Sequence, residues 1–494
     1  MPIRGEPSTE DVKRVLNEQN PWFQTGNVPD AMAKTVERSL GQNLWKAVLR
    51  NDPRRFHVII GPRRVGKTVV MAQTVRHLLA NGIGPRRLFF LRLDHPLLLQ
   101  LPLGALMRIL TRGGSPAPTL ESPTFVFLDE LVYATDWDLW LKTFYDEQHP
   151  VQIVATSSAT AALRQKRPDS GIGRWEEQYL MPYLFTEFLD LMAAAPELPI
   201  ADDFHETIRA LIDMPALDPS VVGVVAELRR VFVLAGGFPE LLLRIPKNDE
   251  ASLILESQRI LRSDAVERAI YKDIPQAFSV DDPMMLERLL YVLAGQNTGL
   301  LSPTNICKEM NQMSQPTFDR YLSYLERAFL VFTLPNYSGR EPTIQKRGRR
   351  LYFVDPAIRN AALQRGLAPL SNPTEMGILL ENMAASQLHA LAIQSQVRLF
   401  HWRSGNDEVD LVYSHPEHPL AFEIASSASH SRRGLVRFCE KHPRFRGRCY
   451  VVAPDAQALK PEDADAGVGT LPLDLFLLAT GRQAEAALRA RLAC

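Results

Sequence analysis

Residues 56–79 read FHVIIGPRRVGKTVVMAQTVRHLL, and the architecture that we expect follows from this stretch. Phe56 to Ile60 form a continuous apolar run of strand length, and the residues after Thr68 repeat apolar side chains at helical spacing. Between strand and helix, the glycines let the backbone curl so that successive N–H groups point to one place, and the following helix adds the positive end of its dipole. The stretch therefore predicts a phosphate-binding loop.

This loop supplies the candidate residues for binding a nucleotide. We expect the Lys67 ammonium to contact the β and γ phosphates and the Thr68 hydroxyl to bind magnesium. A glycine-rich turn without a ligand is the alternative. The nucleotide-binding set consists of Gly61, Pro62, Arg63, Arg64, Val65, Gly66, Lys67 and Thr68.

Further short apolar runs alternate with helical periods. They are RLFFLRL (87–93), TFVFLD (124–129) and VQIVATS (151–157). Continuous apolar strands separated by helices are typical of a buried parallel sheet with helices on both faces. The fold class that we predict is α/β, built on a P-loop NTPase core.

Two neighbouring acids follow the apolar run at 124–128. We expect Asp129 to be the magnesium-side carboxylate and Glu130 to orient and deprotonate a water aimed at the γ phosphate. The pair favours hydrolysis of ATP over simple binding. The alternative is that Glu130 only caps the next helix.

Two softer candidates come next along the chain. The strand at 151–157 ends in Thr156-Ser157-Ser158, where a hydroxyl at the carboxyl edge could face the γ phosphate, unless these residues only form a turn. Arg174, after Gly171-Ile172-Gly173, could neutralise transition-state charge as an arginine finger does, within its own chain or on a neighbour. A solvated loop arginine is the alternative.

The motifs together resemble the bacterial and archaeal P-loop ATPases of the AAA superclass. That resemblance implies an ATPase that uses ATP and Mg²⁺, and it makes Ser158 the sensor position, although the family usually has Thr-Gly-Ser there. The matching pieces include GPRRVGKT (61–68), FLDE (127–130), GRWEEQYLMPYLFTEFL (173–189), GGFPE (236–240), YFVDPAIRN (352–360) and EVDLVY (408–413).

The resemblance also suggests a restriction-endonuclease-like core in the C-terminal part of the chain. In such a core a helix acid, a strand Asp and an E-x-K pair hold a metal ion. The corresponding residues here are Glu381, Asp410 and Glu423, but Ala425 stands where the lysine is required. We therefore favour a fold kept for packing or partner binding over an active nuclease.

The chain is expected to contain five parts. They are a lead-in helix (1–50, with one helical stretch from about residue 30 to residue 50), the ATPase core (51–195), a helical lid (196–278), a winged-helix-like module (279–345) and the restriction-endonuclease-like domain (346–494). The module and its edge carry Arg320, Lys346, Arg347, Arg349 and Arg350, which could bind DNA phosphates or form a solvated basic loop.

Composition limits the possible partners. The 494 residues carry 56 basic and 56 acidic side chains, which argues against a surface devoted to nucleic acid. The four cysteines form no CxxC pair, and no apolar run reaches membrane-spanning length, so we expect a cytoplasmic protein without membrane contact. The function predicted is an ATPase that switches the conformation of its C-terminal half and could form homo-oligomers. Its client is a protein or DNA, and the alternatives are an ATP-gated nucleic-acid effector or a scaffold with little turnover.

Overall fold

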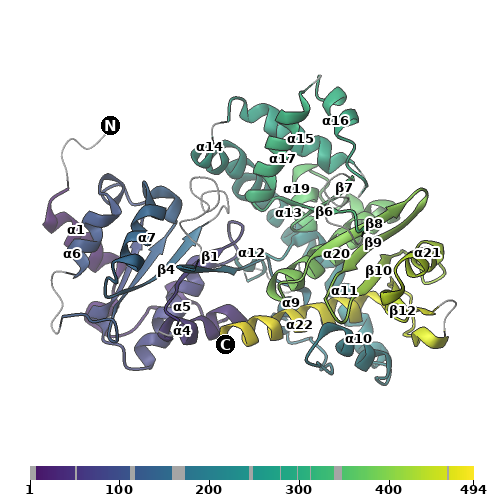
Figure 1. Ribbon diagram of the computed structural model, residues 1–494, viewed down its shortest axis with the longest axis horizontal. Coiled ribbons are helices and arrows are strands. Elements are labelled where there is room, and N and C mark those ends of the chain that lie inside the picture. Colours follow the sequence, from purple (N-terminus) through teal and green to yellow (C-terminus); the bar gives the residue numbers. More distant parts are fainter. Residues whose placement is uncertain are drawn as a thin grey trace. The chain divides into compact units, whose positions relative to one another are not determined.

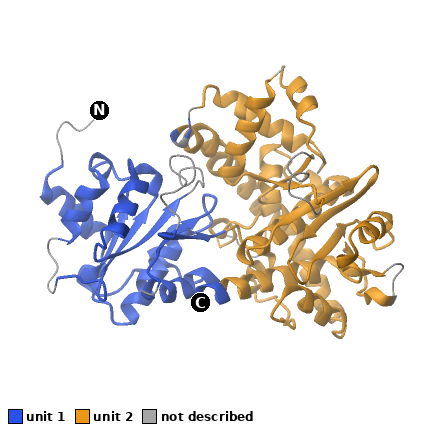
Figure 2. Ribbon diagram, viewed as in Figure 1, with its two compact units in different colours: residues 1–180, 276–279, 489–494 blue, residues 181–275, 280–488 orange. Residues whose placement is uncertain are grey.

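The computed structural model divides the chain into two compact units (Figure 2). Unit 1 comprises Met1–Leu180, Gln276–Ser279 and Arg489–Cys494, and unit 2 comprises Met181–Pro275 and Val280–Leu488. The residues described are 7–50, 53–111, 117–157, 173–243, 249–278, 280–296, 299–311, 313–338, 348–463 and 467–493.

A five-stranded parallel sheet forms the centre of unit 1, in the order β2-β3-β4-β1-β5. This confirms the predicted parallel sheet with the strand order of a P-loop core. The sequence does not predict β5, because two glutamates and a glutamine interrupt its apolar character. The strands are β1 (Phe56–Ile60), β2 (Leu88–Arg92), β3 (Thr124–Asp129), β4 (Val151–Ser157) and β5 (Trp175–Tyr179).

Helices cover both faces of this sheet. In Figure 1, α4 and α5 lie below the strands as drawn and α7 lies above them. The helices of unit 1 are α1 (Thr9–Gln19), α2 (Trp22–Thr25), α3 (Asp30–Ala33), α4 (Ser39–Leu49), α5 (Lys67–Ala80), η1 (Pro85–Arg87), η2 (Leu98–Gln100), α6 (Leu103–Thr111), η3 (Leu131–Tyr133) and α7 (Trp137–Asp146).

The single lead-in helix predicted from about residue 30 to residue 50 is wrong, because α3 and α4 are separate. Lys34 ends α3 with φ 55° and ψ 163°, a conformation that a helix cannot continue. The side chain of Gln73 on α5 then donates to the carbonyl oxygens of Ala33 (2.8 Å) and Val36 (3.0 Å). A tertiary contact therefore uses carbonyl groups that a continuous helix would have paired internally.

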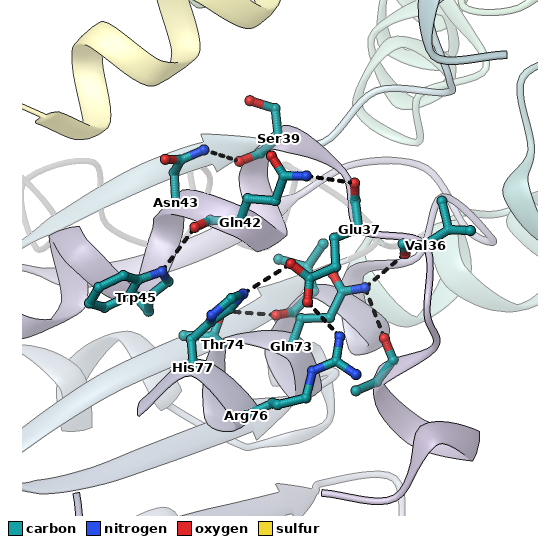
Figure 3. A network of polar contacts seen from close by, with 12 residues as sticks. Val36, Glu37, Ser39, Gln42, Asn43, Trp45, Gln73, Thr74, Arg76 and His77 are labelled. Atoms are coloured by element: carbon teal, nitrogen blue, oxygen red, sulfur yellow. Dashed lines mark hydrogen bonds and ion pairs between the residues drawn. The ribbon is translucent and has the colours of Figure 1, made fainter. Parts of the chain in front are cut away.

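Figure 3 shows how this segment is fastened to α5, the helix that follows the phosphate loop. Glu37 accepts a hydrogen bond from Arg76 and lies 3.0 Å from Nε2 of His77, both on α5. Burial opposes ionisation of Glu37, but these hydrogen bonds outweigh it and lower the pKa of the carboxyl. The N-terminal segment thus holds α5 through an ionised, partly buried carboxylate.

Unit 2 begins with helices. Three of them, α15 to α17, are followed by a two-stranded antiparallel sheet, β6 (Val331–Pro335) and β7 (Arg349–Phe353). The helices are α9 (Phe185–Leu191), α10 (Phe204–Ile212), α11 (Pro219–Ala235), α12 (Pro239–Leu242), α13 (Glu250–Ile260), η4 (Leu261–Glu267), η5 (Ala269–Asp273), α14 (Ile274–Ala277), α15 (Pro283–Gly295), α16 (Pro303–Glu309), α17 (Gln315–Arg327), α19 (Pro356–Ala362), η6 (Ala368–Ser371), α20 (Pro373–Gln394), α21 (Arg433–Lys441), η7 (Pro443–Phe445), η8 (Pro461–Asp463) and α22 (Leu473–Ala493).

A mixed five-stranded sheet with the order β12-β11-β10-β9-β8 completes unit 2. Strands β10, β11 and β12 are parallel, whereas β9 is antiparallel to both of its neighbours. The bounds are β8 (Leu399–Ser404), β9 (Asp407–Tyr413), β10 (Leu420–Ile424), β11 (Cys449–Ala453) and β12 (Val468–Pro472). Among the described helices of both units, none combines the length and the apolar character needed to cross a bilayer.

Candidate functional site

The phosphate loop joins β1 to α5 at the carboxyl end of the parallel sheet of unit 1. Gly66 has a φ of 94°, a left-handed conformation in which a side chain is strained. A Cβ on Gly61 would overlap the carbonyl oxygen of Leu180, whose N–H donates to Ile60 at 2.8 Å. Glycine is therefore favoured at position 66 by the backbone conformation and at position 61 by the close approach of the Leu180 backbone.

Lys67 is the first residue of α5, and its side chain turns back into the loop. Its Nζ donates to the carbonyl oxygens of Gly61 (2.9 Å) and Pro62 (2.8 Å). Only 7% of the residue is exposed, so these carbonyls replace the water that an ammonium requires. The charge is thus held inside the curve of the loop.

Asp129, the last residue of β3, accepts hydrogen bonds from two threonines. Thr68 Oγ1 on α5 lies 3.1 and 3.0 Å from its two carboxylate oxygens, and Thr156 Oγ1 on β4 lies 2.7 Å from Oδ1. Burial raises the pKa of Asp129, against the opposing effect of these hydrogen bonds. The structure therefore brings the two predicted magnesium-side residues, Thr68 and Asp129, into direct contact.

Glu130 follows at the turn out of β3 with φ 59° and ψ 58°. Its N–H donates to Thr156 Oγ1 at 2.9 Å, and its Oε1 lies 3.6 Å from Nη1 of Arg63 in the phosphate loop. Glu130 precedes η3, but its side chain makes no capping hydrogen bond there. The carboxylate thus faces the loop and does not cap the next helix.

Sequence reasoning missed Thr156 as a member of the site. Its hydroxyl connects Asp129 to the backbone of Glu130, so one side chain positions both acids. The signal was present, because Thr156 opens the polar end of β4, but we chose Ser158 from that group. Ser158 lies outside the described residues.

Arg174 lies at the other end of the sheet. Its carbonyl oxygen accepts from Phe56 N at 3.0 Å, at the start of β1, whereas the phosphate loop follows the end of β1. A five-residue strand separates the two positions by about 16 Å. The guanidinium instead pairs with Asp146, at 2.8 and 3.0 Å. The structure does not bring Arg174 to the phosphate loop of its own chain.

The three C-terminal acids also come together, within unit 2, but around an arginine. Arg350 on β7 donates to Asp410 Oδ1 (2.6 Å) and to Glu381 Oε1 (2.8 Å), and Asp410 Oδ2 accepts from Ile424 N at 2.8 Å. The guanidinium lies where a metal ion would have to contact both carboxylates. These residues therefore do not fit a magnesium site.

Glu423 completes this second acid cluster from β10. Its Oε1 lies 3.5 Å from Nε2 of His430, and its buried Oε2 has no hydrogen-bond partner among the described residues. Burial, reinforced by Asp410, raises the pKa of Glu423 to about 8. A carboxyl that keeps its proton at neutral pH is a poor metal ligand. Ala425 offers no cation for catalysis.

One of the candidate DNA-binding cations, Arg350, is used differently from the prediction. Arg350 is buried and pairs with the acid cluster, so its guanidinium is not exposed to a DNA phosphate. Arg320 on α17 lies 3.6 Å from Asp281. Arg349 is the first residue of β7, and Lys346 and Arg347 lie outside the described residues. DNA binding by this module stays a prediction.

Comparison with known proteins adds three domain matches. Residues 53–189 match the AAA domain, residues 226–368 match a domain of unknown function (DUF8612), and residues 376–475 match another (DUF4143). The chain thus carries an AAA-type P-loop ATPase domain, which implies nucleotide binding, followed by two domains of unknown function.

Relatives include uncharacterized proteins of an archaeon and a bacterium. One from Methanocaldococcus jannaschii is 25% identical over 364 residues, which are 73% of this chain and 72% of the relative. One from Haemophilus influenzae is 21% identical over 342 residues, 68% and 76% of the two chains. A solved Walker-type ATPase of Pyrococcus abyssi has 12% identity and a TM-score of 0.38, over 66% of this chain and 95% of that chain.

Proposed function

We propose that this protein hydrolyses Mg-ATP at the phosphate loop of unit 1 and uses the reaction to switch the conformation of its C-terminal half. The contact between Thr68 and Asp129 carries the proposal, because a P-loop hydroxyl and a strand-end carboxylate at 3.0 Å present adjacent oxygen ligands of the kind Mg²⁺ prefers. The two threonine side chains that donate to Asp129 are neutral hydroxyls, so they do not cancel the charge of the carboxylate.

Each residue has a distinct role in this proposal. Lys67 and the backbone N–H groups of the loop at 61–68, in which Pro62 has none, bind the β and γ phosphates, and Thr68 and Asp129 hold the metal ion. The magnesium ion supplies charge neutralisation on the phosphates. Glu130 orients the attacking water and accepts its proton, and the hydrogen bond from its N–H to Thr156 fixes its backbone beside Asp129.

Three finer assignments belong to the same proposal. Ser158 senses the γ phosphate. Arg174 serves a neighbouring copy, because within its own chain it lies at the opposite edge of the sheet. The five ranges given above, from the lead-in helix to the C-terminal domain, are separate domains or segments whose arrangement changes during the ATPase cycle. The client is a protein or DNA.

The test is phosphate release from Mg-ATP by the full chain. We expect Lys67→Ala to abolish ATP binding, and Glu130→Gln to bind ATP but release phosphate at least about 100-fold more slowly. Glu147→Gln is the matched control, because Glu147 is an exposed carboxylate of unit 1 that lies 3.0 Å from His149, and it should turn over as the wild type does.

Turnover of Glu130→Gln at the wild-type rate would remove Glu130 as the base. No phosphate release above background by the wild type, with or without DNA, would overturn hydrolysis and leave a nucleotide-binding scaffold. Stimulation by added DNA would identify nucleic acid as the client, and DNA-independent turnover would favour a protein client.

A further inference from the structure

A group of potential metal ligands lies in unit 2, apart from both acid clusters described above. Asp203 precedes α10, His205 is in its first turn, and His418 lies between β9 and β10. One ligand atom of each lies within 4.8 Å of those of the other two. Nδ1 of His418 is 2.6 Å from Oδ2 of Asp203, although the two residues are 215 positions apart.

The two oxygens of the Asp203 carboxylate have different surroundings. Oδ1 accepts from the Glu206 N–H at 2.9 Å and so caps α10, whereas Oδ2 faces Nδ1 of His418. The backbone therefore fixes the carboxylate so that its other oxygen lies beside the imidazole.

A supporting carboxylate lies behind one of the histidines. Oε1 of Glu206 is 3.1 Å from Nδ1 of His205. A carboxylate bonded to one ring nitrogen fixes the tautomer and makes the other nitrogen a better ligand. The positive charge of Arg448 disfavours a cation here, and the two carboxylates of Asp203 and Glu206 offset it.

The ligands are attached to packed elements. Phe204, between the two α10 ligands, has its ring centroid 5.6 Å from that of Tyr413 on β9 and 6.1 Å from that of Phe422 on β10. These aromatic contacts hold the start of α10 against the mixed sheet. The donor atoms are therefore positioned by the core and not by a free loop.

We propose that Asp203, His205 and His418 bind a divalent transition-metal ion, with Zn²⁺ as the best fit. Two imidazoles and one carboxylate are a ligand set that Zn²⁺ accepts, with a fourth position for water. Bonds of about 2.0–2.1 Å place tetrahedral ligands about 3.3 Å apart, so the 2.6 Å contact between His418 and Asp203 has only to open by a fraction of an ångström. The Asp203 and His418 side chains are 27% and 34% exposed, which leaves the ion a path from solvent.

The test uses the full chain after removal of metal with a chelator. Titration with Zn²⁺, and with Co²⁺ followed by its visible absorption, should show one bound ion per chain. His205→Gln and His418→Gln should each weaken binding at least about 10-fold. His149→Gln is the control, because it removes an exposed histidine that also contacts a carboxylate, and it should bind as the wild type does.

Asp203→Asn provides a second variant that keeps the capping oxygen of α10 while removing the charge, so weaker binding with unchanged circular dichroism would separate ligation from folding. Zn²⁺ should also raise the Tm of the wild type but not that of His418→Gln. Failure of the wild type to bind an equivalent of either ion, or wild-type affinity in both histidine variants, would overturn the site. Neither readout depends on ATP turnover.

Discussion

Unit 1 and unit 2 each bury an aspartate at a strand of their central sheet, and the two carboxylates are hydrogen-bonded by different kinds of donor. Asp129 is held by the hydroxyls of Thr68 and Thr156, which satisfy its oxygens without adding charge. Asp410 is held by the guanidinium of Arg350, which satisfies an oxygen and cancels the charge. Clustered carboxylates therefore do not by themselves mark a metal site, because the charge of their donors decides whether a cation is still attracted.

The largest expected effect comes from removing the cation of the second cluster. Arg350→Met should lower the free energy of unfolding of unit 2 by about 3–5 kcal/mol, because it leaves Asp410 and Glu381 buried without a partner charge. Hydrogen exchange of the β9 and β10 amides measures the loss of stability in unit 2, and the β3 and β4 amides of unit 1 serve as the internal reference.

The matched control is Arg403→Met, which removes a 41%-exposed guanidinium that lies 3.9 Å from Glu408. An exposed pair of this kind contributes about 0–1 kcal/mol. Equal losses in the two variants would show that Arg350 does not compensate buried charge.

The next effect is a difference between the units in their response to magnesium. Mg-ATP at about 100 times its Kd should stabilise unit 1 by about 2.7 kcal/mol, since binding favours the folded state by mass action. Mg²⁺ alone should not protect β9 or β10, because Arg350 already occupies the carboxylates. Protection of those strands by Mg²⁺ without nucleotide would show that Arg350 does not exclude a metal ion from the carboxylates of unit 2.

A smaller effect is expected at the hydroxyl that joins the two acids of unit 1. Thr156→Val keeps the shape but removes one of the hydrogen bonds to Asp129, which keeps that from Thr68, and the acceptor of the Glu130 N–H. We expect a cost of about 1–3 kcal/mol and slower phosphate release. Thr74→Val is the control, because the Thr74 hydroxyl is also buried but donates to the Val70 carbonyl of its own helix, at 2.8 Å. Unchanged turnover in Thr156→Val would show that the hydroxyl does not position Glu130.

The last expected effect is a pH dependence of the stability of unit 2, which is small when it is counted per pH unit. The pKa of Glu423 is about 8, against an ordinary value of 4.5, so the folded unit keeps a proton that the unfolded chain releases. Stability should therefore fall as pH rises from about 4.5 to about 8, by at most about 1.4 kcal/mol per pH unit.

Urea unfolding of unit 2 at several pH values between about 5 and 8 measures this slope. Glu423→Gln should flatten it, because the amide does not titrate. A slope that is as steep in this variant as in the wild type would exclude Glu423 as its source.

The parts of unit 1 that the sequence predicted are those determined by local pattern. The strands at 56–60, 124–129 and 151–157 occupy the predicted ranges, because an apolar run and the loop after it are encoded within a few residues. The phosphate loop and the acids after β3 followed from the same pattern. β5 and the break between α3 and α4 did not, because each depends on a tertiary partner, β1 in one case and Gln73 in the other.

The role of Arg350 could not be predicted for the same reason. In the sequence it ends a basic run and resembles a phosphate-binding residue, whereas its partners Glu381 and Asp410 are 31 and 60 positions away. The convergence of the three acids rested on a family resemblance, and only the structure places a cation among them. Thr156 was within reach, since a hydroxyl residue opens the polar end of β4 beside Asp129.

The pairing of Arg174 with Asp146 at the amino edge of the sheet limits the symmetry of any assembly that uses this arginine in catalysis. A head-to-tail ring places the amino edge of one copy against the carboxyl edge of the next, so each phosphate loop would receive a guanidinium. A two-fold dimer could do the same only if its shared surface extended over both edges of the sheet, a span of about 16 Å along the strands. A filament results where the head-to-tail rotation does not close.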